Sequence, residues 1–511
     1  MEEAPGRPSN VIVVLLDSLN RHMLGAYGGK EFATPNLDAF AAAALRFTKH
    51  YAGSLPCMPA RHDILCGSLD FLWRPWGSIE LWERPITAYL REAGVTTMLA
   101  SDHPHLFETG GENYHTDFTA WDYERGHETD PWKTRADTSW LGAPRIDRSG
   151  SLLPSLYQYD KSRGHFRGEE DFPGPRTMTA ACRWLETSAK HHDRFFLFID
   201  EFDPHEPFDT PEEYMRLYDD TWQGPHLIWP PYMTEAIKSG ALTARQAHQV
   251  RACYGAKLTM IDHWFGKLIA EIERQGLWDD TAVIVCTDHG HYLGERDIFG
   301  KPGVPIYEPM GHIPLFVRWP GALPREVDAL TTSVDLFATL CDVFGVRPEH
   351  TTHGVSLRPL IDRSAERVRD WALAGVWGRE VHLIDDEFVY ARAPEGPNFP
   401  LSMWSNRWSS MPVLHAMPTY RFPVPDDRAV LDRMPGSRIP VIRQPFQQGD
   451  MVPYWAAGRF EGTVLTRPER DPEQRDNLRD TGLEREAADK LRQALLAVQA
   501  PDDQLQRLNL A

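Results

Sequence analysis

The chain contains four short runs of apolar residues, each about the length of one β-strand. They cover Asn10–Leu16 (NVIVVLL), 194–199 (RFFLFI), Thr281–Cys286 (TAVIVC) and 313–317 (IPLFV). A continuous apolar run is typical of a strand that is buried on both faces, as in a parallel sheet. Helical patterns lie between the runs, for example at Ala244–Arg274. Strands that alternate with helices predict an α/β fold, a doubly wound and mainly parallel sheet flanked by helices.

Polar side chains stand at the ends of three of these runs. Asp17 follows the first run, His205 lies shortly after the second, and Asp288 and His289 follow the third. In open α/β sheets, ligands bind beyond the carboxyl ends of the strands. We therefore expect these four residues to converge on one site, although they are far apart in the sequence.

The rest of the chain predicts two domains. Residues 34–52 predict a helix with Thr34 as its cap and Pro35 as its first residue. Short strand-like pieces then follow at 375–384 and 387–394, and a polar helix at 484–498. We expect a large α/β domain over residues 1–370. A smaller α+β subdomain, with a small antiparallel sheet and a terminal helix, is expected over residues 371–511.

Composition excludes several functional classes. The 511 residues include 54 basic and 73 acidic side chains, a net charge of −19, which argues against general binding of nucleic acids. An anionic substrate stays compatible, because a metal or a local basic pocket can reverse the field at one site. No apolar run reaches the ~18 residues of a membrane span or resembles a signal segment, so we expect a cytoplasmic protein without a membrane partner. The 6 cysteines contain no CxxC pair, which argues against a zinc ribbon.

Two short motifs carry the strongest chemical signals. In Cys57-Met58-Pro59-Ala60-Arg61, the arginine could lower the pKa of the thiol or bind an oxyanion; the alternative is a buried cysteine beside a surface arginine. In Asp288-His289-Gly290, the two side chains can ligate a divalent cation where Gly290 permits a sharp turn. Asp17 is a natural third ligand, although either aspartate alone could simply cap a helix.

Two weaker signals come from His205 and Lys301. Prolines on both sides hold His205 in a non-helical loop, which suits a fixed general acid or an oxyanion contact. Lys301 stands between Gly300 and Pro302, where it can point into a site as a cation for a sulfate or phosphate group. Taken alone, His205 is more simply explained as a histidine that hydrogen-bonds within its own loop, and Lys301 as a solvated lysine.

Together these segments resemble the sulfatase branch of the alkaline phosphatase superfamily, which includes the phosphonate monoester hydrolases. CMPARHDILCG fits the pattern C/S-x-P-x-R followed by a Thr/Ser-Gly ending, with Cys66 where Thr or Ser is usual. The segments DPHEPF, VIVCTDHGHYLGERDIFGKPG, IPLFVRWPG and DPEQRDNL match the family in order and approximate spacing. The resemblance spans nearly the whole chain, and it implies an alkaline-phosphatase-like fold.

The resemblance also implies a mechanism. Cys57 would be oxidised to Cα-formylglycine by a formylglycine-generating enzyme. One hydroxyl of the hydrated aldehyde would attack the sulfur and expel an alcohol or phenol, and the second would then release sulfate. The residues implied at one divalent metal ion are Asp17, Ser18, Cys57, Asp288 and His289. The residues implied in catalysis are Cys57, Arg61, His205 and Lys301, with His103 and His105 near the family's Gly-Lys-x-His element.

The metal and the reaction both have alternatives. Ca²⁺ is the favoured ion. Ser18 follows Asp17 where many sulfatases have a second acid, and one fewer carboxylate lowers the charge of the site, which admits Mn²⁺ and Zn²⁺ as alternatives. The favoured activity is hydrolysis of a small-molecule or carbohydrate sulfate ester. The alternatives are a phosphonate monoester or phosphodiester hydrolase with the same nucleophile, and an inactive sulfatase-like binding protein. A homo-oligomer is compatible with the sequence.

Overall fold

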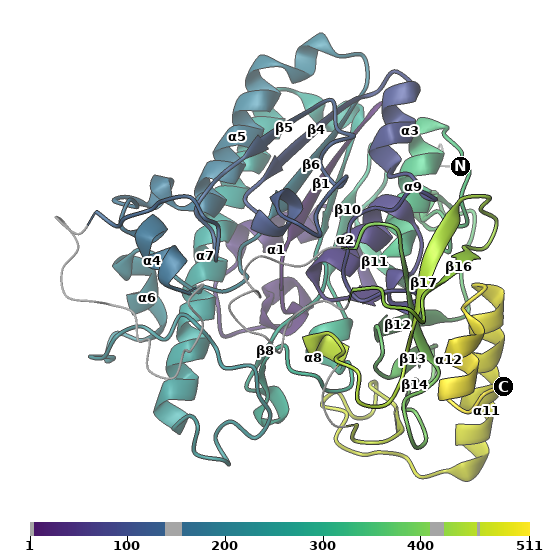
Figure 1. Ribbon diagram of the computed structural model, residues 1–511. Coiled ribbons are helices and arrows are strands. Elements are labelled where there is room, and N and C mark those ends of the chain that lie inside the picture. Colours follow the sequence, from purple (N-terminus) through teal and green to yellow (C-terminus); the bar gives the residue numbers. More distant parts are fainter. Residues whose placement is uncertain (1–4, 138–155, 409–423, 457–459) are drawn as a thin grey trace.

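The centre of the molecule is an eight-stranded sheet in the order β11-β2-β10-β7-β1-β6-β4-β5 (Figure 1). The computed structural model describes residues 5–137, 156–408, 424–456 and 460–511. The strands, in sheet order, are β11 (Arg325–Thr332), β2 (Leu45–Tyr51), β10 (Leu315–Arg318), β7 (Thr281–Cys286), β1 (Asn10–Leu16), β6 (Phe195–Glu201), β4 (Thr96–Ser101) and β5 (Ala120–Tyr123). All neighbours pair in parallel except β10, which is antiparallel to β2 and β7. The predicted mainly parallel α/β fold is confirmed.

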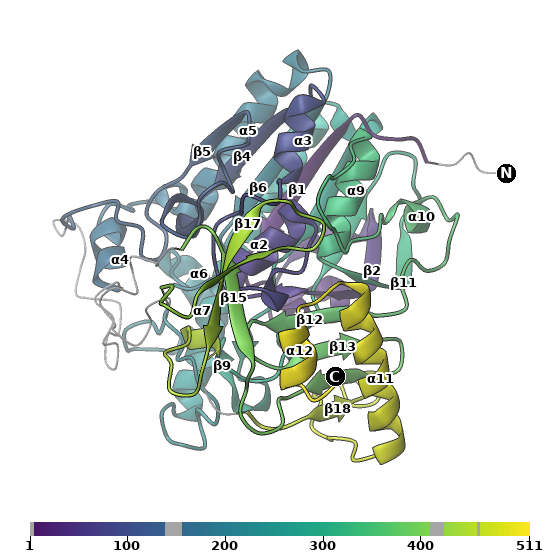
Figure 2. The same cartoon turned by 45° about the vertical axis from the view of Figure 1, so that its right-hand side comes forward.

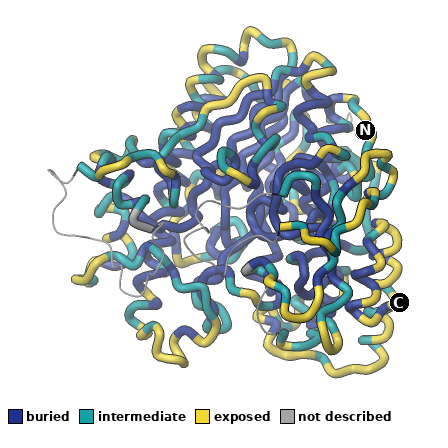
Figure 3. Tube along the Cα trace, in the orientation of Figure 1, coloured by how far each residue is buried: buried dark blue, intermediate teal, exposed yellow. Residues whose placement is uncertain are grey.

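Helices cover both faces of this sheet, so alternate side chains of β1 pack in two different hydrophobic cores. Ile12 and Val14 pack with α1 (Pro35–Ala42), α5 (Pro173–Thr187) and α7 (Ala244–Arg274). Val11 and Val13 pack on the opposite face. There the covering helices are α2 (Cys57–Cys66), α3 (Ile86–Glu92) and α9 (Val334–Phe344). The sheet is buried along most of its width (Figure 3), which explains why its strands read as continuous apolar runs.

The prediction of one helix over residues 34–52 is wrong in its second half. Helix α1 ends at Ala42, and residues 45–51 form β2, which pairs with β10 and β11. Buried Leu45 and Phe47 alternate with more exposed residues there, so pairing on both sides overrides the helical pattern. Thr34 stands at the N-cap position without capping the helix; Asp262 of α7 instead accepts hydrogen bonds from the backbone N–H groups of residues 36 and 37.

A second, five-stranded sheet joins the C-terminal part of the chain to the nucleophile region. Its order is β18 (Val464–Thr466), β14 (Val389–Arg392), β13 (Val381–Ile384), β12 (Ala372–Val376) and β3 (Ser54–Leu55). Strand β3 pairs in parallel with β12 and lies just before α2. Helix α11 (Thr481–Ala497) packs on this sheet, with α12 (Asp502–Arg507) beside it (Figure 2).

The remaining elements are short. A three-stranded sheet consists of β15 (Leu401–Ser405), β17 (Pro440–Phe446) and β16 (Val430–Arg433), and a hairpin of β8 (Tyr292–Leu293) and β9 (Phe299–Gly300). The other helices are α4 (Leu156–Arg163), α6 (Glu212–Tyr218), α8 (Glu308–Gly311) and α10 (Arg358–Ile361). Among the helices of the described residues, none combines the length and the apolar character needed to cross a bilayer.

Gly67 ends α2 in a conformation that only glycine adopts easily. Its φ is +74°, and a Cβ there would lie 2.4 Å from Cδ1 of Phe337 on α9. Gly94, just after α3, offers a matched control: its φ is +73°, but a Cβ there would have no neighbour within 4 Å. The two positions thus separate backbone strain from steric overlap.

We expect Gly94→Ala to lower the free energy of unfolding by about 1–2 kcal/mol, the cost of a side chain in the left-handed region. Gly67→Ala should cost about 1–3 kcal/mol more, because Phe337 must move away. Denaturant unfolding of both variants and the parent measures the difference. Equal destabilisation by the two substitutions would contradict the close packing of α2 on α9.

Candidate active site

The site forms where β7, β1 and β6 end side by side. Leu15 of β1 lies opposite Asp200 of β6 and Cys286 of β7, so the residues that follow these strands emerge together. Asp17 comes directly after β1, and Asp288 comes two residues after β7. Cys57 is the first residue of α2, which brings it to the same edge of the sheet.

Arg61 is the electrostatic centre of the site. Its Nε and Nη2 donate to the two carboxylate oxygens of Asp200 at 2.8 and 2.6 Å. Nη1 donates to Oδ2 of Asp288 at 2.9 Å and to the carbonyl oxygen of Cys57 at 3.2 Å. Nη2 also lies 2.9 Å from Oδ2 of Asp17. All four charged side chains are fully buried, so Arg61 compensates three carboxylates that water cannot reach.

Four residues present their donor atoms to one point. One oxygen each of Asp17 and Asp288, Sγ of Cys57 and a ring nitrogen of His289 all lie within 4.8 Å of one another. Nε2 of His289 is 3.3 Å from Sγ of Cys57 and 3.3 Å from Oδ2 of Asp288. Nδ1 of His289 donates to the carbonyl oxygen of Gly290 at 2.8 Å, which leaves the Nε2 lone pair facing the other three donors.

The ionisation of this quartet fits a bound divalent cation. Burial lowers the pKa of His289 to about 4, so its ring is neutral and able to act as a ligand. Burial, together with the nearby carboxylate of Asp288, raises the pKa of Asp17 well above its ordinary value. Two carboxylates this close repel each other when both are ionised, and a cation between them removes that repulsion. The donor set, two carboxylates and one imidazole, suits Ca²⁺ or Mn²⁺ and admits Zn²⁺.

Ser18 links the quartet of Asp17, Cys57, Asp288 and His289 to Lys301. Its Oγ donates to Oδ1 of Asp17 at 2.7 Å and accepts from Nζ of Lys301 at 3.3 Å, and its backbone N–H donates to Oδ1 of Asp288 at 3.0 Å. Its φ of 60° lies in the left-handed region, a strained conformation of the kind that clusters at functional sites.

Lys301 and His205 form a buried pair beside the quartet. Nζ of Lys301 lies 2.6 Å from Nε2 of His205, whose Nδ1 donates to the carbonyl oxygen of Glu206 at 2.7 Å. Burial keeps the pKa of His205 well below its ordinary value. Burial opposes a charge on Lys301 too, but the anionic groups around it, Glu206 first and then Cys57, Asp17 and Asp288, together outweigh burial and raise the pKa of the ammonium. The shared proton therefore resides on Lys301, which donates to a neutral His205.

The two candidate histidines after β4 differ in their surroundings. His103 is fully buried, and neither of its ring nitrogens has a hydrogen-bond partner among the described residues. Burial and the nearby Arg61 hold the pKa of His103 well below its usual range. His105 is instead paired with Glu108 and Glu128, which overcome its burial and raise its pKa to about 10. His103 thus offers free ring nitrogens beside Arg61, whereas those of His105 are engaged.

The structure adds two acidic residues that the sequence analysis did not select. Asp200 binds Arg61 through both oxygens, and Glu206 contacts Nε2 of His291 at 3.2 Å and Nζ of Lys301 at 3.8 Å. An acid inside a buried apolar strand was the available signal for Asp200. Glu206 stood in the quoted DPHEPF loop, but its role depends on Lys301, which is distant in sequence.

Comparisons with known proteins agree with this geometry. The sulfatase family model matches residues 9–346. A choline-sulfatase of Rhizobium meliloti (strain 1021) is 26% identical over 389 residues, which cover 70% of this chain and 72% of that protein.

Two solved structures share the fold. The phosphonate monoester hydrolase of Agrobacterium radiobacter has a TM-score of 0.63 at 18% identity, covering 97% of this chain and 96% of that one. A protein solved in complex with its substrate D-glucosamine-2-N,6-O-disulfate has a TM-score of 0.64 at 15% identity, covering 98% and 99%. With the family match extending over most of the chain and the site lying inside it, this protein belongs to the sulfatase family, a family of sulfuric ester hydrolases.

Proposed function

We propose that this protein hydrolyses sulfate esters with a formylglycine nucleophile derived from Cys57, at one divalent metal ion. The observation that carries the proposal is the convergence of Sγ of Cys57 with oxygens of Asp17 and Asp288 and a nitrogen of His289. A nucleophile at position 57 lies beside these ligands, and the guanidinium of Arg61 hydrogen-bonds the carbonyl oxygen of the same residue. This arrangement suits attack on an ester whose non-bridging oxygens are negatively charged.

The metal would be held by Asp17, Asp288 and His289. It supplies Lewis-acid stabilisation of the anionic oxygens and lowers the pKa of a coordinated hydroxyl. Ca²⁺ is our first expectation because oxygen donors predominate, and the imidazole of His289 makes Mn²⁺ and Zn²⁺ the alternatives. The hydrated aldehyde at position 57 supplies two hydroxyl groups, one to attack and one to release sulfate.

Protein groups supply the remaining positive charge and the proton. Arg61 pairs with three buried carboxyl groups and orients the backbone of residue 57 through its hydrogen bond to that carbonyl oxygen. Lys301 carries a proton at Nζ, within reach of the leaving oxygen, and His205 accepts from it. The neutral His103 offers a further hydrogen-bonding group beside Arg61. These residues bind an anion and return a proton to the departing alcohol or phenol.

The substrate class follows from the family. We propose small-molecule or carbohydrate sulfate esters, in keeping with the choline-sulfatase relative and the structural neighbour whose substrate is a sulfated glucosamine. Cys57 is 4% exposed, so an enzyme that oxidises it would act before the fold is complete, and we propose that this enzyme is a formylglycine-generating enzyme.

The nucleophile is tested by Cys57→Ala. We expect aryl sulfate turnover to fall by several orders of magnitude, since removal of a nucleophile from other covalent hydrolases costs ~10⁶ in kcat. Peptide mass spectrometry across residue 57 should show a thiol-to-aldehyde conversion in active protein. Cys341→Ala, which removes another buried thiol on α9, is the control and should retain turnover. Unchanged activity in Cys57→Ala would exclude the proposed mechanism.

The ester class is tested by comparing an aryl sulfate with an aryl phosphonate that carries the same leaving group. We expect the higher kcat/KM on the sulfate. Ser18 stands where many sulfatases have a second carboxylate, and this departure from the sulfatase pattern is the observation that favours the alternative. A higher kcat/KM on the phosphonate would assign the protein to phosphonate ester hydrolysis instead.

Metal dependence is tested by removal and restoration. Dialysis against a chelator should abolish turnover, because the Lewis acid that would stabilise the anionic oxygens of the ester is then absent. Ca²⁺, Mn²⁺ and Zn²⁺ are added back separately, with Asp288→Asn as the control that none should restore. Full activity in protein shown by elemental analysis to be metal-free would contradict the proposal.

A further inference from the structure

A second group of residues of the types that bind metal ions lies at the C-terminal half of α2, away from Cys57. His62 and Cys66 are four residues apart on this helix, so their side chains project from the same face. Glu83, from the segment before α3, reaches the same place, and one donor atom from each residue lies within 4.8 Å of the other two. All three side chains are buried.

The hydrogen bonding of this trio is incomplete. Nε2 of His62 lies 2.8 Å from Oε2 of Glu83, yet the pair is not aligned as a hydrogen bond, and neither ring nitrogen of His62 has a hydrogen-bond partner among the described residues. The other oxygen of Glu83 is fixed: Oε1 accepts from Nη2 of Arg74 and from the backbone N–H of Glu80, each at 3.0 Å. Glu83 is therefore held so that Oε2 faces the imidazole.

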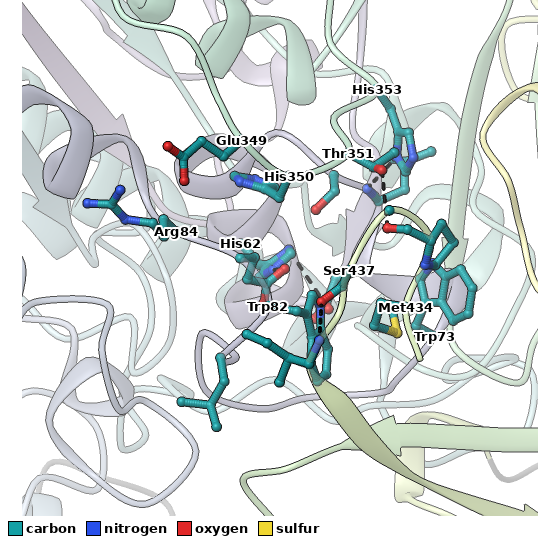
Figure 4. Close-up of a pocket in the computed structure, with 18 of the residues that line it drawn as sticks. His62, Trp73, Trp82, Arg84, Glu349, His350, Thr351, His353, Met434 and Ser437 are labelled. Atoms are coloured by element: carbon teal, nitrogen blue, oxygen red, sulfur yellow. Dashed lines mark hydrogen bonds and ion pairs between the residues drawn. The ribbon is translucent and has the colours of Figure 1, made fainter. Parts of the chain in front are cut away.

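A cavity of about 320 Å³ opens onto two members of this trio, His62 and Glu83 (Figure 4). His62 and Glu83 line it together with Trp73, Trp82 and His350, and Figure 4 shows His62 among these side chains. Its volume lies in the ~300–1,000 Å³ range of ligand sites. None of the residues that form the active site lines it. Small molecules or water in this cavity can thus approach the trio independently of the active site.

A comparison with another buried cluster separates a metal site from a simple ion network. Asp102, His127 and Asp203 also bring donor atoms within 4.8 Å. There, however, Nζ of Lys257 lies 2.5 Å from Oδ1 of Asp203 and 3.3 Å from Nε2 of His127, so the protein's own ammonium already neutralises the group. At the trio, Arg74 binds the far oxygen of Glu83. The carboxylates of Asp70 and Glu83 overcome burial and raise the pKa of His62 well above its usual range, so the positive charge on the near side is a proton on the imidazole, which a metal ion would displace.

We propose that His62, Cys66 and Glu83 form a second metal site that takes Zn²⁺ or a similar borderline divalent ion. One imidazole, one thiolate and one carboxylate are the ligands that Zn²⁺ prefers, and the two anionic ligands neutralise the charge of the ion. The cavity supplies the fourth position for water or a small ligand. Cys66 occupies the position where the sulfatase signature usually has Thr or Ser, so the sulfur ligand departs from that signature.

The test uses the full-length Cys57→Ala protein, in which the thiol at the active site is absent. Co²⁺ added to this protein should give the near-ultraviolet charge-transfer absorption of a cobalt–thiolate bond. Elemental analysis after equilibration with Zn²⁺ is made on the Cys57→Ala/Asp288→Asn double variant, which also lacks an active-site carboxylate, and should show one tightly bound equivalent. Both measurements report on the second site alone, so they stay informative even if the esterase proposal fails.

Substitutions in the trio assign the ligands. We expect Cys66→Thr to abolish the charge-transfer band, and both Cys66→Thr and His62→Gln to weaken Zn²⁺ binding by more than the roughly 10–100-fold that loss of an outer-shell partner costs. Cys341→Ser, another buried thiol outside the trio, is the matched control and should leave both readouts unchanged. The absence of a cobalt–thiolate band in the Cys57→Ala protein would overturn the proposal, and this result does not depend on whether variants of the trio fold. A Zn²⁺ affinity that Cys66→Thr leaves unchanged would overturn it as well.

Discussion

The site depends on one buried guanidinium. Arg61 holds the carboxylates of Asp17, Asp200 and Asp288 within hydrogen-bonding or ion-pair distance, and none of these groups is accessible to water. Burial of an unpaired charge is costly, and removal of one partner from a buried ion pair typically costs about 3–5 kcal/mol. Arg61 therefore does more than bind residue 57: it allows the acidic side chains of Asp17, Asp200 and Asp288 to lie close together in the interior.

The topology makes that approach possible. Because β7, β1 and β6 are parallel neighbours, the residues after each strand emerge at the same edge of the sheet. Helix α2 then delivers Cys57 and Arg61 from a single segment, one turn apart. The strongly acidic surface implied by the net charge of −19 has little bearing on substrate choice, since the anion would meet a metal, Arg61 and Lys301 inside the protein.

The sequence predicted the elements whose pattern is local. The bounds of β1, β7 and α7 agree with the prediction at both ends, because continuous apolar runs and a long amphipathic period need no partner to be recognised. Residues 45–51 were misassigned because strand pairing decides their structure. The sequence did not identify Asp200 and Glu206 as site residues, because their partners, Arg61 and Lys301, lie about a hundred residues away in the chain. Contacts of this kind are set by tertiary structure alone.

The pairing of β3 with β12 limits how early during synthesis the backbone next to Cys57 can reach its final structure. Strand β3 ends one residue before Pro56, and its partner begins at Ala372, so roughly 300 residues must be synthesised before the pair can form. At ordinary rates of translation this takes on the order of tens of seconds. During that interval the backbone around Cys57 lacks a neighbour on one side, and in the finished fold the side chain is enclosed. An enzyme that modifies Cys57 would then compete with the completion of the C-terminal sheet, and the order of synthesis along the chain would set how long it has.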